Sequence, residues 1–134
     1  MPIKFQKTTL DVGLVTTDPE EAHHFYGEVL GLPFEGELEL PGIGRIRRYQ
    51  VGENILRIFV PVTEPLSRGS TDGFSSQTGL RYLTLKVENL EEVVAEVAAA
   101  GYKIVVPVID LRPGVKVSQI EDKEGNALEL MQEA

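Results

Sequence analysis

Few side chains in this sequence could do chemistry, and the two histidines are the first to consider. His23 and His24 are adjacent on a predicted helix, so their side chains diverge by about 100° and cannot bind one metal ion as residues four apart can. Both lie beside or away from the apolar stripe of that helix, and we expect them on a solvent-exposed face. The chain has no cysteine, which excludes disulfides and thiolate chemistry.

A basic cluster on a predicted strand is the second group. Alternation puts Arg45 and Arg47 on one face of the strand and Arg48 on the other. If the first pair faced a ligand, it would favour an anion. We favour the interpretation that the cluster balances acidic residues across neighbouring strands. Those acidic residues would be Glu35, Glu37 and Glu39. The sequence has no P-loop, no Gly-rich dinucleotide turn and no serine nucleophile motif.

The helices and strands that must position these groups are predicted in the same order in each half of the sequence. In the first half, apolar alternation over 10–16 predicts a strand, and Asp18-Pro19-Glu20-Glu21 is typical of a capped helix start, with Gly31 at its end. In the second half, alternation over 82–87 predicts a strand, and a helix follows that is capped by Asn89 and ends at Gly101. Turn residues and further strands follow each helix.

The spacing within the two halves agrees. Asp11 and Arg57 are 57 − 11 = 46 positions apart, and Tyr82 and Glu129 are 129 − 82 = 47 positions apart. We therefore predict one α+β domain over residues 1–134, made of two βαβββ repeats (9–60 and 80–132). A linker loop joins the repeats over 61–79. Its one aromatic residue, Phe74, could pack on the domain or contact a ligand, and we expect packing. The alternative is a plain α+β domain whose halves merely look alike.

The net charge and composition of the chain exclude some classes of binding partner. The 21 acidic and 13 basic residues give a net charge of −8, which argues against nucleic acid or an anionic membrane surface as partner. The same balance would suit a cationic ligand or serve only solubility. Because the N-terminus lacks a signal-peptide core and no apolar run is long enough to span a membrane, we expect a cytoplasmic protein.

Two motifs give the chain a family resemblance. Asp122-Lys123-Glu124-Gly125-Asn126 running into a strand, and Phe25-Tyr26-Gly27-Glu28 in the first helix, resemble motifs of the vicinal oxygen chelate superfamily. This superfamily includes glyoxalase I, bleomycin-resistance proteins and extradiol dioxygenases. The resemblance covers about Thr9 to Gln132. It implies two modules that form a cupped, mixed β-sheet cleft with the helices outside, and a homodimer. It does not imply one chemistry, because the fold hosts several.

The resemblance also maps four metal-ligand positions onto Asp11, Arg57, Tyr82 and Glu129. Only Glu129 has the residue type that family enzymes usually carry there, and both expected histidines are missing. A guanidinium repels a divalent cation and pairs well with carboxylates. We therefore expect a metal-free cleft in which Arg57 bridges Asp11 and Glu129, with no cofactor. If a metal were bound, its ligands would be Asp11, Tyr82 and Glu129.

Two functions remain open at this stage. In the first, the cleft binds a small organic ligand, as in the bleomycin-resistance branch, through Asp11, Arg57, Tyr82, Lys86 and Glu129. In the second, the chain is a lyase, isomerase or dioxygenase with an atypical site, and no catalytic residue can be assigned. A structural ion pair that only joins the two repeats is weighed equally with ligand contact for the charged residues.

Overall fold

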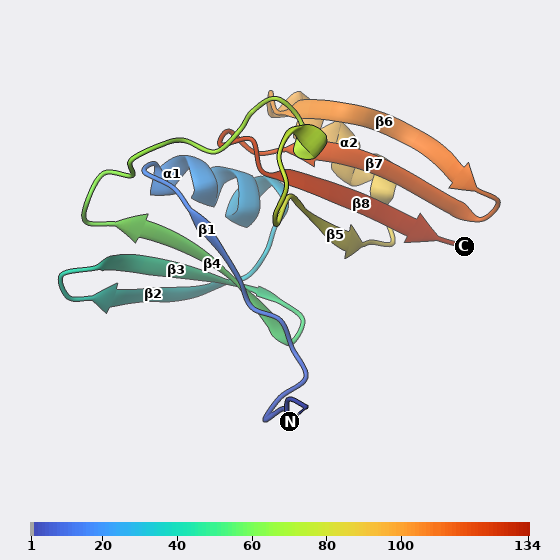
Figure 1. The fold of residues 1–134 in the computed structure, drawn as a ribbon. Helices are drawn as coiled ribbons and strands as arrows, with labels where there is room; N and C mark the ends of the chain where they lie inside the picture. The colour runs from blue at the N-terminus through green and yellow to red at the C-terminus, as the bar shows by residue number, and fades with distance from the viewer. Residues whose placement is uncertain (1) are drawn as a thin grey trace. The chain divides into compact units, whose positions relative to one another are not determined.

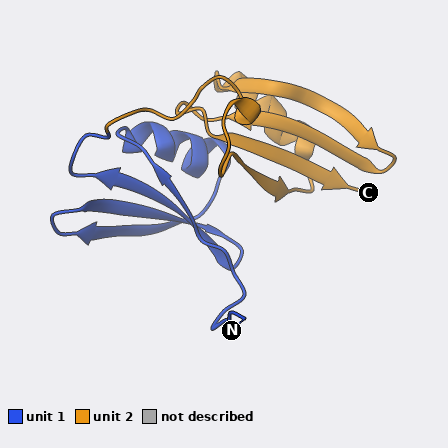
Figure 2. Ribbon diagram, in the orientation of Figure 1, with its two compact units in different colours: residues 1–65 blue, residues 66–134 orange. Residues whose placement is uncertain are grey.

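The computed structural model describes residues 2–134 and divides into two compact units, 1–65 and 66–134 (Figure 2). The boundary between the units falls inside the predicted linker, 61–79. Each unit is described by itself below. Whether the two modules enclose a common cleft stays a prediction. No helix of the described residues is both long and apolar enough to cross a membrane.

Unit 1 is a four-stranded mixed sheet with one helical segment (Figure 1). Its sheet has the strand order β1-β4-β3-β2, in which β1 runs parallel to β4 and the other neighbours are antiparallel. The elements are β1 (Val12–Val15), α1 (Pro19–Ala22), η1 (His23–Val29), β2 (Phe34–Leu40), β3 (Gly44–Val51) and β4 (Asn54–Pro61).

Unit 2 has the same topology, with the strand order β5-β8-β7-β6 and a parallel β5–β8 pair. Its elements are η2 (Phe74–Ser76), β5 (Tyr82–Lys86), α2 (Leu90–Ala99), β6 (Lys103–Arg112), β7 (Val115–Glu121) and β8 (Ala127–Glu133). The predicted α+β class and the two similar modules are confirmed.

The strand registers of the two units also correspond. In unit 1, Gly13 of β1 is the Cα partner of Arg57, and in unit 2, Thr84 of β5 is the Cα partner of Glu129. Asp11 precedes Gly13 by two residues, and Tyr82 precedes Thr84 by two residues. The pairs that the repeat equates, Asp11 with Arg57 and Tyr82 with Glu129, therefore have the same relative positions in the two sheets.

The first helix begins as predicted and continues differently. The backbone N–H of Glu21 donates to Asp18 Oδ1 at 3.1 Å, which is the predicted cap. From His23 to Val29, however, the segment is a π-helix. Gly27 lies in this stretch, where a Cβ would come within 2.9 Å of the His23 ring and 3.2 Å of the Tyr49 ring. Glycine therefore lets these two rings approach the helix backbone.

The second helix corrects a detail of the prediction. Asn89 stands before α2, but its side chain makes no capping hydrogen bond to the backbone. Its amide donates instead to Glu92 at 3.3 Å. The backbone N–H of Leu90 donates to the side-chain oxygen of Gln132 on β8 at 3.0 Å. A contact with a strand distant in the sequence thus replaces the local cap. A sequence pattern around Asn89 could not have predicted this contact.

Each sheet packs one face on its own helix. The unit 1 core includes Phe25, Tyr26 and Ile58, and the unit 2 core includes Leu90 and Ile120; all five are at most 1 % exposed. Because side chains alternate along a strand, the neighbours of these core residues point to the opposite, open face of each sheet. Asp11, Arg57, Tyr82 and Glu129 all alternate with helix-facing residues, and this assigns them to the open faces.

Candidate functional site

Asp11 and Arg57 form an ion pair on the open face of unit 1. Arg57 Nη2 lies 3.0 Å from Asp11 Oδ2, and the two side chains are 48 % and 35 % exposed. Asp11 Oδ1 accepts a hydrogen bond from the backbone N–H of Ile55 at 3.0 Å. Both carboxylate oxygens of Asp11 are therefore engaged. The predicted second contact, from Arg57 to Glu129, joins residues of different units and stays a prediction.

Tyr82 and Glu129 line a pocket on the open face of unit 2. The pocket has a volume of about 150 Å³. We call it the Phe74–Tyr82 pocket, and its lining residues are Phe74, Tyr82, Val106, Val117, Ser118, Gln119 and Glu129. The hydroxyl of Thr84 donates to Glu129 Oε1 at 2.8 Å. This bond orients the carboxylate, and within the described residues of unit 2 Glu129 has no ion pair.

Phe74 is held over Tyr82 by the linker. The two rings meet edge to face, with centroids 5.4 Å apart and an interplanar angle of 75°. Arg81 donates from Nε to the backbone oxygen of Phe74 at 3.1 Å and from Nη1 to Gln77 at 3.3 Å. The prediction that Phe74 packs on the domain is thus confirmed, and the same ring also forms a wall of the pocket.

The linker is also held where it passes the Asp122 turn. Arg68 Nη1 lies 3.7 Å from a carboxylate oxygen of Glu124. A Cβ on Gly125 would come within 2.8 Å of the Ser70 backbone oxygen, and Gly125 has a φ of 84°. Only glycine tolerates both the conformation and the approach. Asp122 Oδ1 accepts from the backbone N–H groups of Glu124 and Asn126. The motif behind the resemblance is therefore a turn that starts β8.

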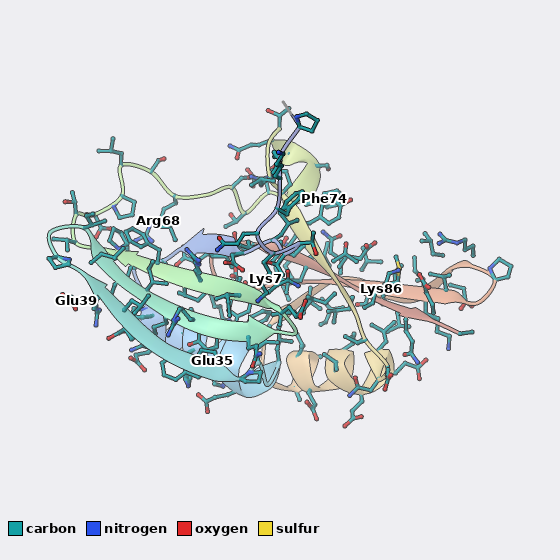
Figure 3. The ribbon with its side chains drawn as sticks, turned by 90° about the horizontal axis from the view of Figure 1, so that it is seen from below. Lys7, Glu35, Glu39, Arg68, Phe74 and Lys86 are labelled. Atoms are coloured by element: carbon teal, nitrogen blue, oxygen red, sulfur yellow. The ribbon has the colours of Figure 1, made fainter. Side chains whose placement is uncertain are left out.

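Lys86 is the remaining predicted site residue. It lies at the end of β5, and Figure 3 labels it together with Phe74 of η2. Its Nζ lies 3.0 Å from a carboxylate oxygen of Glu133, and its side chain is 67 % exposed. Lys86 does not line the Phe74–Tyr82 pocket. A contact between Lys86 and a ligand stays a prediction.

His23 corrects the expectation of a solvent-exposed pair of histidines. Its Nδ1 lies 2.7 Å from the hydroxyl of Tyr49, and its ring meets Phe34 edge to face with centroids 5.6 Å apart. Both His23 and His24 are half-buried. Tyr49 is fully buried, and this burial raises the pKa of its phenol. The β3 partner could not be recognised from the helix sequence.

The arginine cluster behaves as the favoured interpretation predicts. Arg47 lies 3.2 Å from Glu37 and 2.9 Å from Glu20, and Arg45 lies 3.9 Å from Glu37. Arg47 also donates to the backbone oxygen of Pro19, which places it on the helix side of the sheet. Arg48, on the other face, is the Cα partner of Arg57 and donates to the backbone oxygen of Glu35.

A second, larger concavity of about 460 Å³ lies where α2 begins and the β6–β7 and β8 ends meet. Two of its five acidic lining residues have ion pairs: Glu91 with Lys116 at 3.3 Å and Glu133 with Lys86 at 3.0 Å. None of Asp11, Arg57, Tyr82 and Glu129 lines it. We therefore take the smaller Phe74–Tyr82 pocket as the candidate site, because it joins two predicted site residues to aromatic and polar groups.

Sequence reasoning missed part of this pocket. Gln119 lies beside Glu129 because the two residues are Cα partners across β7 and β8. Counting back from the Asp122–Asn126 turn along both strands would have found this pair. Val106 could not have been found in this way, because β6 pairs with β7 through three register shifts.

The topology and the repeated register define a class: proteins built from paired βαβββ modules. The chain belongs to the glyoxalase/bleomycin resistance protein/dioxygenase superfamily, whose family model matches residues 8–130. No curated protein matches the chain closely enough to count as a relative.

Solved structures agree with this assignment. The chain is 27% identical to SMU.1112c (TM-score 0.76, covering 95% of this chain and 99% of that one). It is 28% identical to a glyoxalase family protein from Enterococcus faecalis (TM-score 0.69, covering 95% and 98%). A glyoxalase family protein from Bacillus cereus, 20% identical, is similar over 99% of both chains with a TM-score of 0.84. This last likeness concerns the fold alone.

Proposed function

We propose that this chain is a binding protein that holds a small organic molecule in the Phe74–Tyr82 pocket without a metal ion. The observation that carries the proposal is the composition of the pocket. Two aromatic rings and two valines supply apolar surface, while the side chains of Glu129 and Gln119 supply a few polar groups. Such a mixture of apolar walls and sparse polar anchors is typical of small-molecule sites.

The donor atoms do not fit the metal that the superfamily's enzymes hold. Asp11 uses both carboxylate oxygens within its own unit, one of them on a guanidinium. Tyr82 offers a phenol, which does not belong to the imidazole and carboxylate ligand sets of these metals. Within the described residues of each unit taken by itself, no group of three or more His, Asp or Glu side chains could hold a metal ion. Imidazole and carboxylate clusters are what Zn, Ni, Fe and Mn prefer.

Metal analysis is the first test of this proposal. We expect the purified protein, after dialysis against buffer with each of Ni, Zn, Fe and Mn, to retain less than a stoichiometric amount of metal. Stoichiometric metal would overturn the metal-free part and favour the alternative function, a lyase, isomerase or dioxygenase with an atypical site. The ligands would then be sought among Asp11, Tyr82 and Glu129.

A thermal-shift screen tests binding itself. Small organic molecules that enter the pocket should raise the melting temperature of the wild type, because a ligand that binds only the folded state stabilises it. The rise should disappear when Glu129 and Tyr82 are replaced together by alanine. A rise that is unchanged in this double variant would place the ligand elsewhere.

We also propose a homodimer, which the superfamily resemblance implied. A row of apolar side chains crosses the open face of unit 1, and each residue of the row is the Cα partner of the next. The row consists of Val15, Phe59, Ile46 and Leu38. Val15 and Leu38 at its two ends are 53% and 45% exposed. Contiguous exposed apolar surface is typical of protein interfaces.

A further inference from the structure

We propose that the Phe74–Tyr82 pocket selects ligands carrying a planar, positively charged nitrogen group, with Glu129 as the counter-charge. This inference rests on the proposed function and adds the chemical class of the ligand. Three observations carry it: a carboxylate without a cationic partner within its own unit, two exposed aromatic rings beside it, and a further, buried carboxylate on the same sheet face.

The first observation is the difference between the two units at equivalent positions. In unit 1 the carboxylate of Asp11 is neutralised by Arg57 at 3.0 Å. In unit 2 the equivalent pair is Tyr82 and Glu129, and within the described residues of this unit Glu129 accepts only the neutral hydroxyl of Thr84. That bond uses Oε1 and fixes the carboxylate, so Oε2 is free to accept from a ligand. A partly buried carboxylate gains most from a charged donor.

The second observation is the aromatic wall. Phe74 and Tyr82 are 39% and 55% exposed although they contact each other. An edge-to-face contact covers one ring face and leaves other ring surface available. Ring faces attract cations through their quadrupole, and planar cations also stack on them. A flat cation can therefore touch an aromatic ring and the carboxylate of Glu129 at the same time.

The third observation is Glu121. It lies on β7 two residues after Gln119 and is only 4% exposed. By register it is the Cα partner of Ala127, which is in turn the partner of Tyr82. Its Oε2 is buried with no hydrogen-bond partner, and its ion pair with Lys103 is long, at 3.8 Å. Because the ion pair is long and Oε2 has no partner, the carboxylate of Glu121 is only partly balanced, which makes the same sheet face more negative and favours a cation there.

The pocket volume limits the size of the group that enters. About 150 Å³ is the size of a cavity that can hold a benzene molecule. One six-membered ring with a small substituent fits, and a larger ligand would extend beyond the pocket. Benzamidine, benzamide and benzoate have nearly the same shape and carry charges of plus one, zero and minus one. They are therefore matched probes for charge.

The experiment is a titration of the full chain with each probe, followed through the backbone amide signals of 74, 82, 119 and 129 by NMR. We expect benzamidine to bind about tenfold more tightly than benzamide, because it gains one charged hydrogen bond. Benzoate should bind more weakly than both.

Glu129→Gln keeps the acceptor for Thr84 and should remove the preference for benzamidine while benzamide still binds. Glu133→Gln, on the same strand but outside the pocket, removes the same charge and should keep the preference.

The alternative outcomes separate the two proposals. If benzamide and benzamidine shift the pocket signals with equal affinity, the cation inference is overturned and the binding function stands. A preference that survives in Glu129→Gln and disappears in Glu121→Gln would overturn the role of Glu129. If none of the three probes shifts these signals, both the pocket's function and its ligand class are wrong. Circular dichroism melting of each variant checks that it is folded.

Discussion

At the scale of single residues, the Asp11–Arg57 pair invites a direct test. The pair is half-exposed, so its loss should cost little. We expect Arg57→Ala to lower the free energy of unfolding by less than about 1 kcal/mol. Asp11→Ala should cost about 1 kcal/mol more, because it also leaves the backbone N–H of Ile55 without its acceptor. Asp11→Asn should recover part of this extra loss.

Urea unfolding of the three variants measures these differences. A cost for Arg57→Ala that equals or exceeds that of Asp11→Ala would contradict a simple surface pair. It would show that Arg57 has a further partner, of which the predicted contact with Glu129 is the first to examine by a double-mutant cycle.

The second residue-scale prediction concerns alkaline pH. Burial raises the pKa of the Tyr49 phenol in the folded chain above its ordinary value near 10. A raised pKa stabilises the fold below the unfolded-state pKa, and this stabilisation is lost as pH rises through the folded-state pKa. The stability advantage of wild type over Tyr49→Phe should therefore be about 1 kcal/mol at pH 7, from the hydrogen bond to His23, and should shrink above about pH 10.

Guanidinium unfolding of both proteins between pH 7 and pH 11 gives this difference directly, because the lysines that also titrate there are common to both. An advantage that stays constant across the range would show that Tyr49 does not lose its proton at a different pH in the folded and unfolded chains. His23→Gln at neutral pH is a useful companion, since it removes the imidazole but leaves the phenol buried.

Some of these side-chain contacts could be predicted from the sequence, and others could not. The Asp11–Arg57 pair was expected, because the family resemblance maps both residues onto one site and a guanidinium pairs well with a carboxylate. The Tyr49–His23 contact did not follow, because it joins a helix to a strand through a π-helical segment that Gly27 permits. Nor could we predict that Glu129 lacks an ion pair within the described residues of unit 2, because the order of charges along the chain does not show which acidic side chain lies near a basic one.

At the scale of elements, the start of α2 gives a prediction that reverses the sequence expectation. Gln132 on β8 accepts from the N–H of Leu90, whereas Asn89 makes no capping bond to the backbone. We expect Gln132→Ala to lower the free energy of unfolding by about 1 kcal/mol, the usual value of a lost cap. Asn89→Ala should cost less, because it removes only the exposed contact with Glu92.

Thermal and urea unfolding of the two variants test this order. Gln132→Glu is a matched control, because it keeps an acceptor for Leu90 and places a negative charge at the helix start, where such a charge is favourable. The reverse order of costs, with Asn89→Ala the more destabilising, would show that the local cap operates in solution.

The sequence predicted where helices and strands occur. It did not predict the type of the first helical segment or the exact ends of the elements. Period-2 alternation located the strands, and Asp18 marked the first helix start correctly. The π-helix over His23–Val29 depends on how two aromatic rings pack beside Gly27. The register shifts between β6 and β7 likewise depend on tertiary packing, so no pattern in the sequence announces them.

At the scale of the whole molecule, the repeat predicted the topology because each module must bury one sheet face on its own helix. The same argument leaves the open faces uncovered within each module. In unit 1 the open face carries the apolar row from Val15 to Leu38 as well as the cations of Arg48 and Arg57. In unit 2 it carries the negative Phe74–Tyr82 pocket. The modules kept one architecture and diverged in the chemistry of these faces.

The last prediction follows from the apolar row. If a second copy of the chain covers this row, a charged side chain placed in it should weaken the dimer, because burying an unpaired charge costs free energy. We expect wild type to elute as a dimer in size-exclusion chromatography with light scattering. Leu38→Glu should raise the dissociation constant of the dimer by about tenfold or more. Leu80→Glu is the matched control, since Leu80 is fully exposed outside the strands and the substitution is the same. A wild-type monomer at all concentrations would contradict the homodimer, and an equal shift in both variants would place the interface away from the row.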